Sequence, residues 1–193
     1  MKNVTQLTDQ ELVLSYMNGN THALSTLIER HKNKIYTSIY LLVKDKYLAE
    51  DLFQDAFIKV IDTLKAGRYN DEGKFLPWVL RIAHNLCVDH FRKVKRSPSI
   101  KTSDNNDIFE VLNLSDAGAE HEIMEGQTRD KIRQMIDLLP EDQREVIILR
   151  NYADLSFKEI ATLTNSSINT CLGRMRYALL NLRKMMTEKQ IAL

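Results

Sequence analysis

The sequence predicts an all-α protein made of two small helical domains that a flexible acidic linker joins. Helix signals recur along the chain, whereas the alternation of apolar and polar residues that is typical of strands is nearly absent. Only 6 Gly and 3 Pro interrupt the 193 residues, which argues against a turn-rich all-β fold. Because 44% of the residues are hydrophobic, the chain can build real cores, and wholesale disorder is excluded.

The distribution of charge indicates where the domains lie. Residues 1–100 carry 15 Lys and Arg against 11 Asp and Glu, residues 101–130 carry 2 against 8, and residues 131–193 carry 10 against 7. Two mildly basic blocks therefore flank an acidic stretch, which is the pattern of two domains and a linker.

We place the domains at residues 1–97 and 129–193, and the linker at residues 98–128. The linker is rich in Ser, Asn, Asp and Gly, and it contains one weak amphipathic segment, Ile108–Leu114.

Four helices are expected in the first domain. Thr8 and Glu11 form a capping box for the first, which ends near Asn18-Gly19-Asn20, and Thr21 caps the second. The apolar positions of the second helix are Leu24, Leu27, Ile28, Ile35, Ile39 and Leu42.

The third helix spans about 48–64, and a loop bracketed by Gly67 and Gly73 follows it. Pro77 fits the first turn of the fourth helix, which runs to about Arg96 and ends at Pro98. The apolar face of the third helix consists of Leu52, Phe53, Phe57, Val60, Ile61 and Leu64.

The second domain begins with a helix over about 129–139, and Pro140 is expected in the first turn of the next one. A second capping box, Ser156-x-x-Glu159, starts a short helix that the polar stretch 164–167 ends, and a last helix runs from Ser167 beyond Met185. This succession is a helix-turn-helix pattern. The positions expected to pack its two helices together are Ile160, Ala161, Leu163, Ile168 and Cys171.

Charge makes the helix-turn-helix a candidate for binding DNA. No Asp or Glu occurs from Ile160 through Thr187, while four basic residues lie on the last helix. A carboxylate there would be repelled by the phosphates of a DNA groove, and ordinary surface helices mix both signs.

The first domain carries a second basic and aromatic signal. Five basic residues and no acid lie between His90 and Ser103, downstream of several aromatic residues. Such platforms suit unpaired bases. We expect Trp78 in the core and Tyr69, in the glycine-bracketed loop, as a ring that faces solvent.

The third helix has an acidic face that would repel DNA. It therefore faces either solvent or a basic protein partner. Its acids are Asp45, Glu50, Asp51, Asp55 and Asp62.

Other classes of protein find little support. No apolar run approaches the ~20 residues of a membrane span, and the first residues lack the apolar core of a signal peptide. Cys87 and Cys171 cannot form a disulfide framework or a CxxC pair. We expect a cytoplasmic protein that is not inserted in a membrane, with no cofactor, no metal site and no catalytic residue.

Two segments of the first domain, 49–59 and 75–85, resemble region 2 of extracytoplasmic-function (ECF) sigma factors of the sigma-70 family. Residues 139–146, leading into 155–161, resemble region 4 of the same family. The resemblance implies a region 2 helical bundle, a region 4 helix-turn-helix, and a chain that binds core RNA polymerase and directs promoter-specific initiation.

The resemblance also assigns residues to partners. The acidic helix would meet the β′ clamp helices through Glu50, Asp51, Gln54 and Asp55, and the β flap is a further contact on core polymerase. The −10 element would be opened by Lys59, Tyr69, Arg81, Ile82, Asn85, Arg92 and Lys93. The −35 duplex would be read by Arg150, Asn169, Thr170, Arg174, Arg176, Tyr177 and Lys184. An anti-sigma factor is left open as a partner.

The chain departs from the family at the start of the last helix, where many relatives carry Gly-Thr-Val-Arg-Ser-Arg and this chain carries residues 169–174, Asn-Thr-Cys-Leu-Gly-Arg. Leu172 replaces a cation, and Gly173 costs about 1 kcal/mol of helix propensity relative to Ala. The −35 sequence therefore cannot be copied from a relative.

Two alternatives remain at this point. A stand-alone helix-turn-helix regulator would explain residues 140–186 but would leave residues 49–96 without a role. A metal-dependent hydrolase would use His84, Cys87, Asp89 and His90, although their spacing puts only the first two on one helix face.

Overall fold

The computed structural model describes residues 7–70, 73–96 and 131–188. These residues form helices and contain no strand, which confirms the predicted all-α class. The chain folds into two compact units, of which the first includes helices α1–α4 and the second includes α8. The linker 98–128, its segment Ile108–Leu114, Pro98 and both predicted domain boundaries lie outside the described residues, so these expectations stay predictions.

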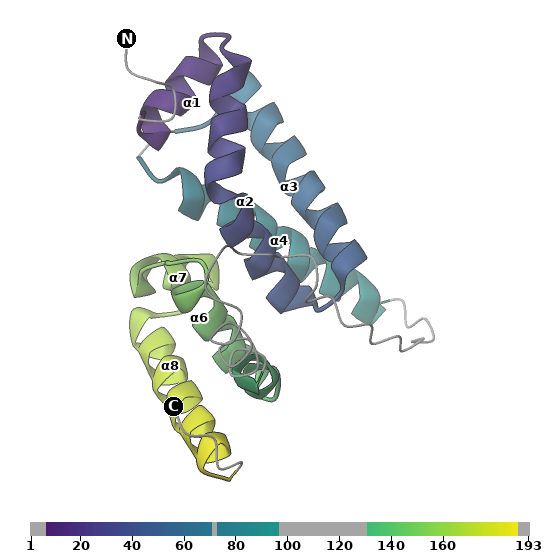
Figure 1. Cartoon of the computed structure of the whole chain (residues 1–193), viewed down its shortest axis with the longest axis vertical. Coiled ribbons are helices and arrows are strands. Elements are labelled where there is room, and N and C mark those ends of the chain that lie inside the picture. Colours follow the sequence, from purple (N-terminus) through teal and green to yellow (C-terminus); the bar gives the residue numbers. More distant parts are fainter. Residues whose placement is uncertain (1–6, 71–72, 97–130, 189–193) are drawn as a thin grey trace, which may run out of the picture. The chain divides into compact units, whose positions relative to one another are not determined.

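Helices α1 (Asp9–Met17), α2 (Thr21–Val43), α3 (Lys46–Lys65) and α4 (Phe75–Arg96) form a bundle (Figure 1). The helices α2, α3 and α4 contact one another pairwise, and α1 packs on α2 and α3. Fully buried side chains from all four helices, Leu12 and Val13 of α1 included, make the core of this bundle, as the apolar spacing predicted. Among them are Leu27, Ile35 and Ile39 of α2, Val60 and Leu64 of α3, and Phe75 and Val79 of α4.

Polar contacts at the start of α1 hold it on α2. The capping box of Thr8 and Glu11 is present as predicted. Asp9 then accepts from the Arg30 guanidinium at 2.6 Å and lies 2.7 Å from Nε2 of His31. The two partners of this carboxylate are successive residues of α2, so one acid links the start of α1 to α2 at two neighbouring positions.

Two residue assignments in this bundle, the cap of α2 and one member of the acidic face of α3, are corrected. Thr21 is the first residue of α2, not its cap, because the side chain of Asn20 occupies the cap position and accepts from the backbone N–H of His22 at 3.1 Å. Asp45 caps α3 by accepting from the backbone N–H of Leu48, so it does not belong to the acidic face of that helix.

The C-terminal helices are α6 (Glu141–Asn151), α7 (Phe157–Leu163) and α8 (Ile168–Glu188), and residues 131–137 are also helical. Pro140 stands just before α6 rather than in its first turn, since its carbonyl accepts from the backbone N–H groups of Gln143 and Arg144. No helix in the described part of the chain has both the length and the apolar character needed to cross a membrane.

The helix-turn-helix forms where the sequence predicted it. The backbone turns at Asn165, which has a φ of 51°, and the N–H of Ser166 donates to the carbonyl of Ala161 at 2.9 Å. The buried positions are Ile160, Ala161, Leu163 and Cys171. Ile168 is 45% exposed, so its expected place in the interface was wrong; it is the first residue of α8 and precedes the face that packs.

Candidate nucleic-acid and protein interfaces

The exposed face of α3 combines acids with apolar side chains. Asp51, Gln54 and Asp55 are exposed at a spacing of three and four residues, which places them on one side of the helix. Tyr47, one turn before Asp51, is 78% exposed, and Ile58, one turn after Gln54, is 55% exposed. An exposed strip of acids flanked by large apolar groups has the composition of a protein-binding surface.

Sequence patterns had assigned only the charged part of this surface. Tyr47 and Ile58 were missed, although their spacing from the acids would have found them. Glu50, in contrast, is half-buried. Burial and the nearby Glu50 carboxylate raise the pKa of Tyr36, a residue of α2, above its ordinary value.

The loop between α3 and α4 ends in an aromatic cluster. Gly67 and Gly73 adopt φ values of 63° and 70°, which the loop needs at its two ends. The centroid of the Tyr69 ring lies 4.3 Å from that of the Trp78 ring, which in turn lies 5.9 Å from the centroid of the Phe75 ring. Tyr69 is therefore half-buried against α4 and not open to solvent as expected, because the Trp78 ring packs against it. Trp78 was expected in the core, and this expectation is also corrected, because the ring is only half-buried.

A polar stripe continues along α4 from this aromatic cluster. Arg81 and Asn85 are exposed, and Ile82 between them is half-buried. Asn85 follows Trp78 by seven residues, so it lies on the same side of α4 and roughly 10 Å further along the axis. The structure therefore places Tyr69 and Asn85 at two ends of one stripe. Lys59 is exposed on α3.

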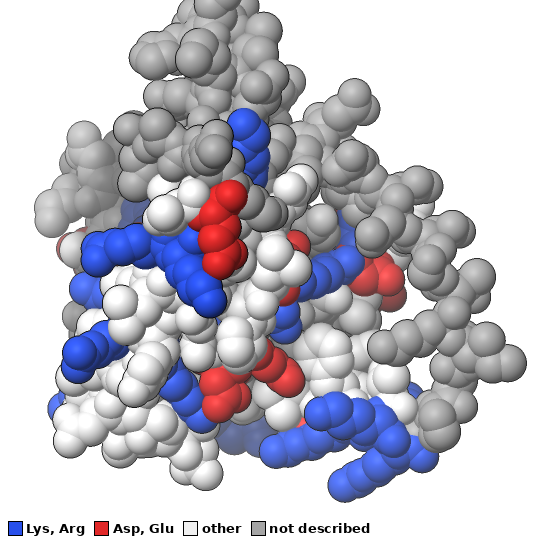
Figure 2. Space-filling model, turned by 90° about the horizontal axis from the view of Figure 1, so that it is seen from below, with Lys and Arg blue, Asp and Glu red and all other residues white. Residues whose placement is uncertain are grey.

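The last turns of α4 expose a basic end. Arg92, Lys93, Lys95 and Arg96 are all exposed. Arg92 also lies 3.5 Å from Asp89, with both side chains about two-thirds exposed, so this pair contributes little to stability. Figure 2, which views the molecule from below, shows Lys and Arg side chains (blue) and Asp and Glu side chains (red) on the surface that is drawn.

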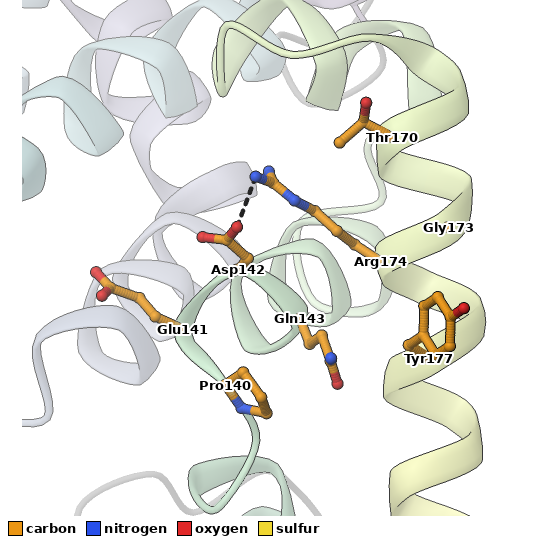
Figure 3. A pocket seen from close by; sticks show the side chains of 8 residues that line it. All are labelled: Pro140, Glu141, Asp142, Gln143, Thr170, Gly173, Arg174 and Tyr177. Carbon is orange, nitrogen blue, oxygen red and sulfur yellow. Dashed lines mark hydrogen bonds and ion pairs between the residues drawn. The ribbon is translucent and has the colours of Figure 1, made fainter.

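On α8, the predicted residues divide between two sides of the helix. Asn169 and Arg176 are exposed on one side, whereas Tyr177, which is 62% exposed, follows Arg174 by three residues and lies nearer to its side. Arg174 instead extends toward α6, where Nη2 lies 2.6 Å from Oδ2 of Asp142 (Figure 3). The remaining predicted contacts, Thr170 and Lys184, are also exposed, and Lys184 lies 3.9 Å from Glu188.

Arg150, the predicted −35 residue outside α8, supports the turn between α6 and α7. Its Nη1 donates to the carbonyl of Leu155 at 2.9 Å, and its guanidinium carbon lies 5.3 Å from the centre of the Phe157 ring. The side chain remains partly exposed to solvent, so a phosphate contact stays a prediction.

The hydrolase alternative lacks its site in the described part of the chain. His84 and Cys87 are buried in the bundle, whereas Asp89 is exposed. Burial raises the pKa of the Cys87 thiol to about 12, so it is protonated at neutral pH. Among the described residues, no group of three His, Cys, Asp or Glu side chains could hold a metal ion.

Comparison with known proteins identifies the same two segments. The family model of Sigma-70 region 2 matches residues 27–97, and that of Sigma-70, region 4 matches residues 129–182. The RNA polymerase sigma-H factor of Pseudomonas aeruginosa is 31% identical over 175 residues, 89% of this chain and 90% of the relative. The ECF RNA polymerase sigma-E factor of Escherichia coli is 31% identical over 88% of this chain and 89% of its own length.

Solved structures share the fold. CnrH, in complex with the cytosolic domain of CnrY, matches with a TM-score of 0.65 and 19% identity over 94% of this chain and 99% of that one. The sigma factor RpoE of Bartonella quintana, in complex with the anti-sigma factor NepR, matches with a TM-score of 0.62 and 19% identity over 85% and 96%. With both family models matched in order and 31%-identical relatives aligned over most of their length, the chain belongs to the ECF sigma factors of the sigma-70 family.

Proposed function

We propose that this sigma factor binds core RNA polymerase through the exposed face of α3 and places two DNA-binding surfaces on a promoter. The loop before α4 and the exposed stripe of α4 open the −10 element, and α8 reads the −35 duplex. One observation carries the proposal: α3 exposes acids and apolar groups, whereas the described length of α8 has no acid before Glu188. The two surfaces therefore suit opposite kinds of partner.

The acidic face of α3 fits a basic protein surface, as the β′ clamp helices would be, and the β flap is a second proposed contact. Exposed Tyr47 and Ile58 supply apolar area, and Asp51 and Asp55 supply the charge that steers the encounter. Complexes of the structural relatives with CnrY and with the anti-sigma factor NepR support an anti-sigma factor as a further partner of this chain.

The −10 surface combines stacking with base-edge contacts. Tyr69 and Trp78 form the aromatic end, and Asn85 offers both a donor and an acceptor to a flipped base. Lys59, Arg81, Arg92 and Lys93 are exposed cations suited to the strand backbone, and Ile82 lies beside the stripe.

For the −35 element, Asn169 and Arg176 are the proposed groups that reach base edges, and Thr170, Tyr177 and Lys184 contact the backbone. The protein works in the cytoplasm, where polymerase and DNA are. A stand-alone regulator is not supported, because the region 2 match over residues 27–97 gives that domain a role such a regulator would not need.

Run-off transcription tests the proposal. Templates carrying a randomised upstream segment are transcribed by core polymerase with and without the chain, and the transcripts are sequenced. We expect transcripts from a defined subset of templates only when both proteins are present. Equal output without the chain, or no output with it, would contradict the proposed function.

A further inference from the structure

Two arginines in the first half of α8, Arg174 and Arg176, leave the helix on opposite sides. Successive residues of an α-helix are rotated by about 100°, so positions two apart point about 160° away from each other. Arg176 and Asn169, seven residues apart, share the exposed side of α8. Arg174 leaves the opposite side, and its side chain is 25% exposed.

The first turn of α6 holds the side of α8 that carries Arg174. Asp142 accepts from the Arg174 guanidinium at 2.6 Å, and Oε1 of Gln143 accepts from Nδ2 of Asn181 at 2.8 Å. Arg174 and Asn181 are seven residues apart and therefore form one stripe two turns long. Two successive residues of α6 thus contact α8 at two positions along its axis, and these contacts fix the rotation of α8 about that axis.

Figure 3 shows the hollow that this arrangement leaves between the two helices. The first turn of α6 lines one wall, and Thr170, Gly173, Arg174 and Tyr177 line the other. The Arg174 side chain crosses the hollow toward Asp142 instead of following the exposed side of α8.

We propose that Arg174 is a positioning residue and not a base-reading one: with Asn181, it sets the rotation of α8 so that Asn169 and Arg176 face the DNA. The inference rests on the proposed function and narrows it, since it removes Arg174 from the groups that read the −35 sequence. Asp142, which no sequence pattern singled out, becomes its partner in that role.

A charge swap separates the two roles. Arg174→Asp and Asp142→Arg each place like charges together, and each should weaken binding of the holoenzyme to its −35 duplex. The double variant restores an ion pair of opposite polarity. Because the swap restores the contact that orients α8, and the swapped ion pair itself adds little stability, we expect the double variant to bind within about fivefold of the wild type. A direct contact to guanine would instead leave the double variant as weak as Arg174→Asp, roughly 5- to 150-fold below the wild type.

The measurement uses the full chain bound to core polymerase and a pool of duplexes with a randomised −35 segment, with the bound fraction sequenced. The double variant should select the same bases as the wild type, and Arg176→Ala should relax the choice at one position. Glu141→Arg combined with Arg174→Asp is the matched control. This pair of substitutions leaves the net charge of the chain unchanged, as the double swap does, but it places the new arginine at residue 141, next to the position that pairs with residue 174.

Circular dichroism of each variant shows whether α8 is retained. A second comparison uses alanine substitutions and no reversed charges. The double variant Asp142→Ala with Arg174→Ala should bind the −35 duplex as strongly as Asp142→Ala alone. Additive losses, or a relaxed base choice in the double swap, would overturn the inference while leaving the proposed function intact. A wild-type holoenzyme that selects no −35 sequence would overturn both.

Discussion

At the scale of single residues, Gly173 shows that one helix position is not optimised for folding. A Cβ added there would meet nothing within 4 Å, so packing does not require glycine. We expect Gly173→Ala to raise the free energy of unfolding by about 0.5–1 kcal/mol, because alanine has less backbone entropy to lose in a helix. Urea titration followed by circular dichroism measures the change.

Gly67 is the control of opposite sign. It also has open space around its Cβ position, but its φ of 63° is one that other residues rarely adopt. Gly67→Ala should therefore lower the stability by about 1 kcal/mol. Shifts of the same sign at both positions would show that the backbone conformation does not decide the effect.

Tyr69 and Asn85 make the test of strand opening. Tyr69→Ala and Asn85→Ala should each slow formation of the open complex and leave closed-complex affinity nearly unchanged, because duplex contacts carry that affinity. The defect should shrink on a template already mismatched across the −10 element. The bases of such a template are unpaired from the start, so the few kcal/mol that unpairing costs need not be supplied by the protein. Permanganate footprinting of matched and mismatched templates reports the opening.

The two variants differ in what else they remove. The Tyr69 ring packs on Trp78 at 4.3 Å, so its loss also lowers stability, whereas Asn85 is exposed and its substitution is the cleaner test. Normal opening by Asn85→Ala on the matched template would remove the amide from the proposed site.

At the scale of whole elements, the outer face of α3 is expected to carry core binding. Asp51→Lys together with Asp55→Lys should abolish co-purification with core polymerase, because both carboxylates are exposed and reversal replaces attraction by repulsion. The fold should be retained. Affinity capture of core polymerase, with circular dichroism of the free chain, measures both.

Glu29→Lys together with Asp89→Lys is the matched control for α3. It changes the net charge equally, at exposed positions on α2 and α4. Loss of core binding in this control as well would show that net charge, and not the face of α3, decides the interaction.

The start of α7 depends on one carboxylate. Oε2 of Glu159 accepts from the Ser156 backbone N–H at 2.9 Å and from its hydroxyl at 2.6 Å. Burial raises the pKa of Glu159, but the hydrogen bonds from Ser156 lower it, and the net direction is down. Because the folded-state pKa is depressed, the stabilisation is present above the unfolded value of about 4.3 and is lost as the pH falls through the folded pKa.

Ser156→Ala should therefore cost about 1 kcal/mol of stability at pH 7, and less as the pH falls below about 4. Ser167→Ala is the control, because Ser167 caps α8 through the Thr170 backbone N–H at 3.0 Å, with no carboxylate in that bond. Thermal melts are recorded at a series of pH values. The difference in melting temperature between the wild type and Ser156→Ala should become smaller as the pH falls, whereas the difference between the wild type and Ser167→Ala should stay constant. A constant difference for both would contradict the role of Glu159.

At the scale of the whole molecule, the proposed −10 and −35 surfaces lie on separate helices of a chain that folds into two compact units. Each surface alone offers few DNA contacts. When both domains are bound to core polymerase, the two surfaces are held in place together, so that DNA bound by one surface meets the other at a high effective concentration. Without core polymerase, the chain should bind promoter and scrambled duplexes alike, as measured by fluorescence anisotropy. Sequence-specific binding by the free chain would contradict this dependence.

Periodicity and capping chemistry were sufficient to predict the helices. The capping boxes of Thr8 and Ser156 and the helix-turn-helix break at 164–167 depend on residues three or four apart, so a local pattern contains all the partners involved. The competition between adjacent caps was less predictable, and Asn20 displaced Thr21 because its side chain is better placed for the first free N–H groups.

The sequence by itself determined the helical class, the helix-turn-helix, the exposed acids of α3 and the family, because each is written in local spacing or in motifs. The tertiary structure alone decided three things: Tyr69 packs on Trp78, the Glu50 carboxylate helps to raise the pKa of Tyr36, and Arg174 pairs with Asp142. These partners lie 9, 14 and 32 positions apart, and no periodic pattern specifies which side chains meet once helices pack.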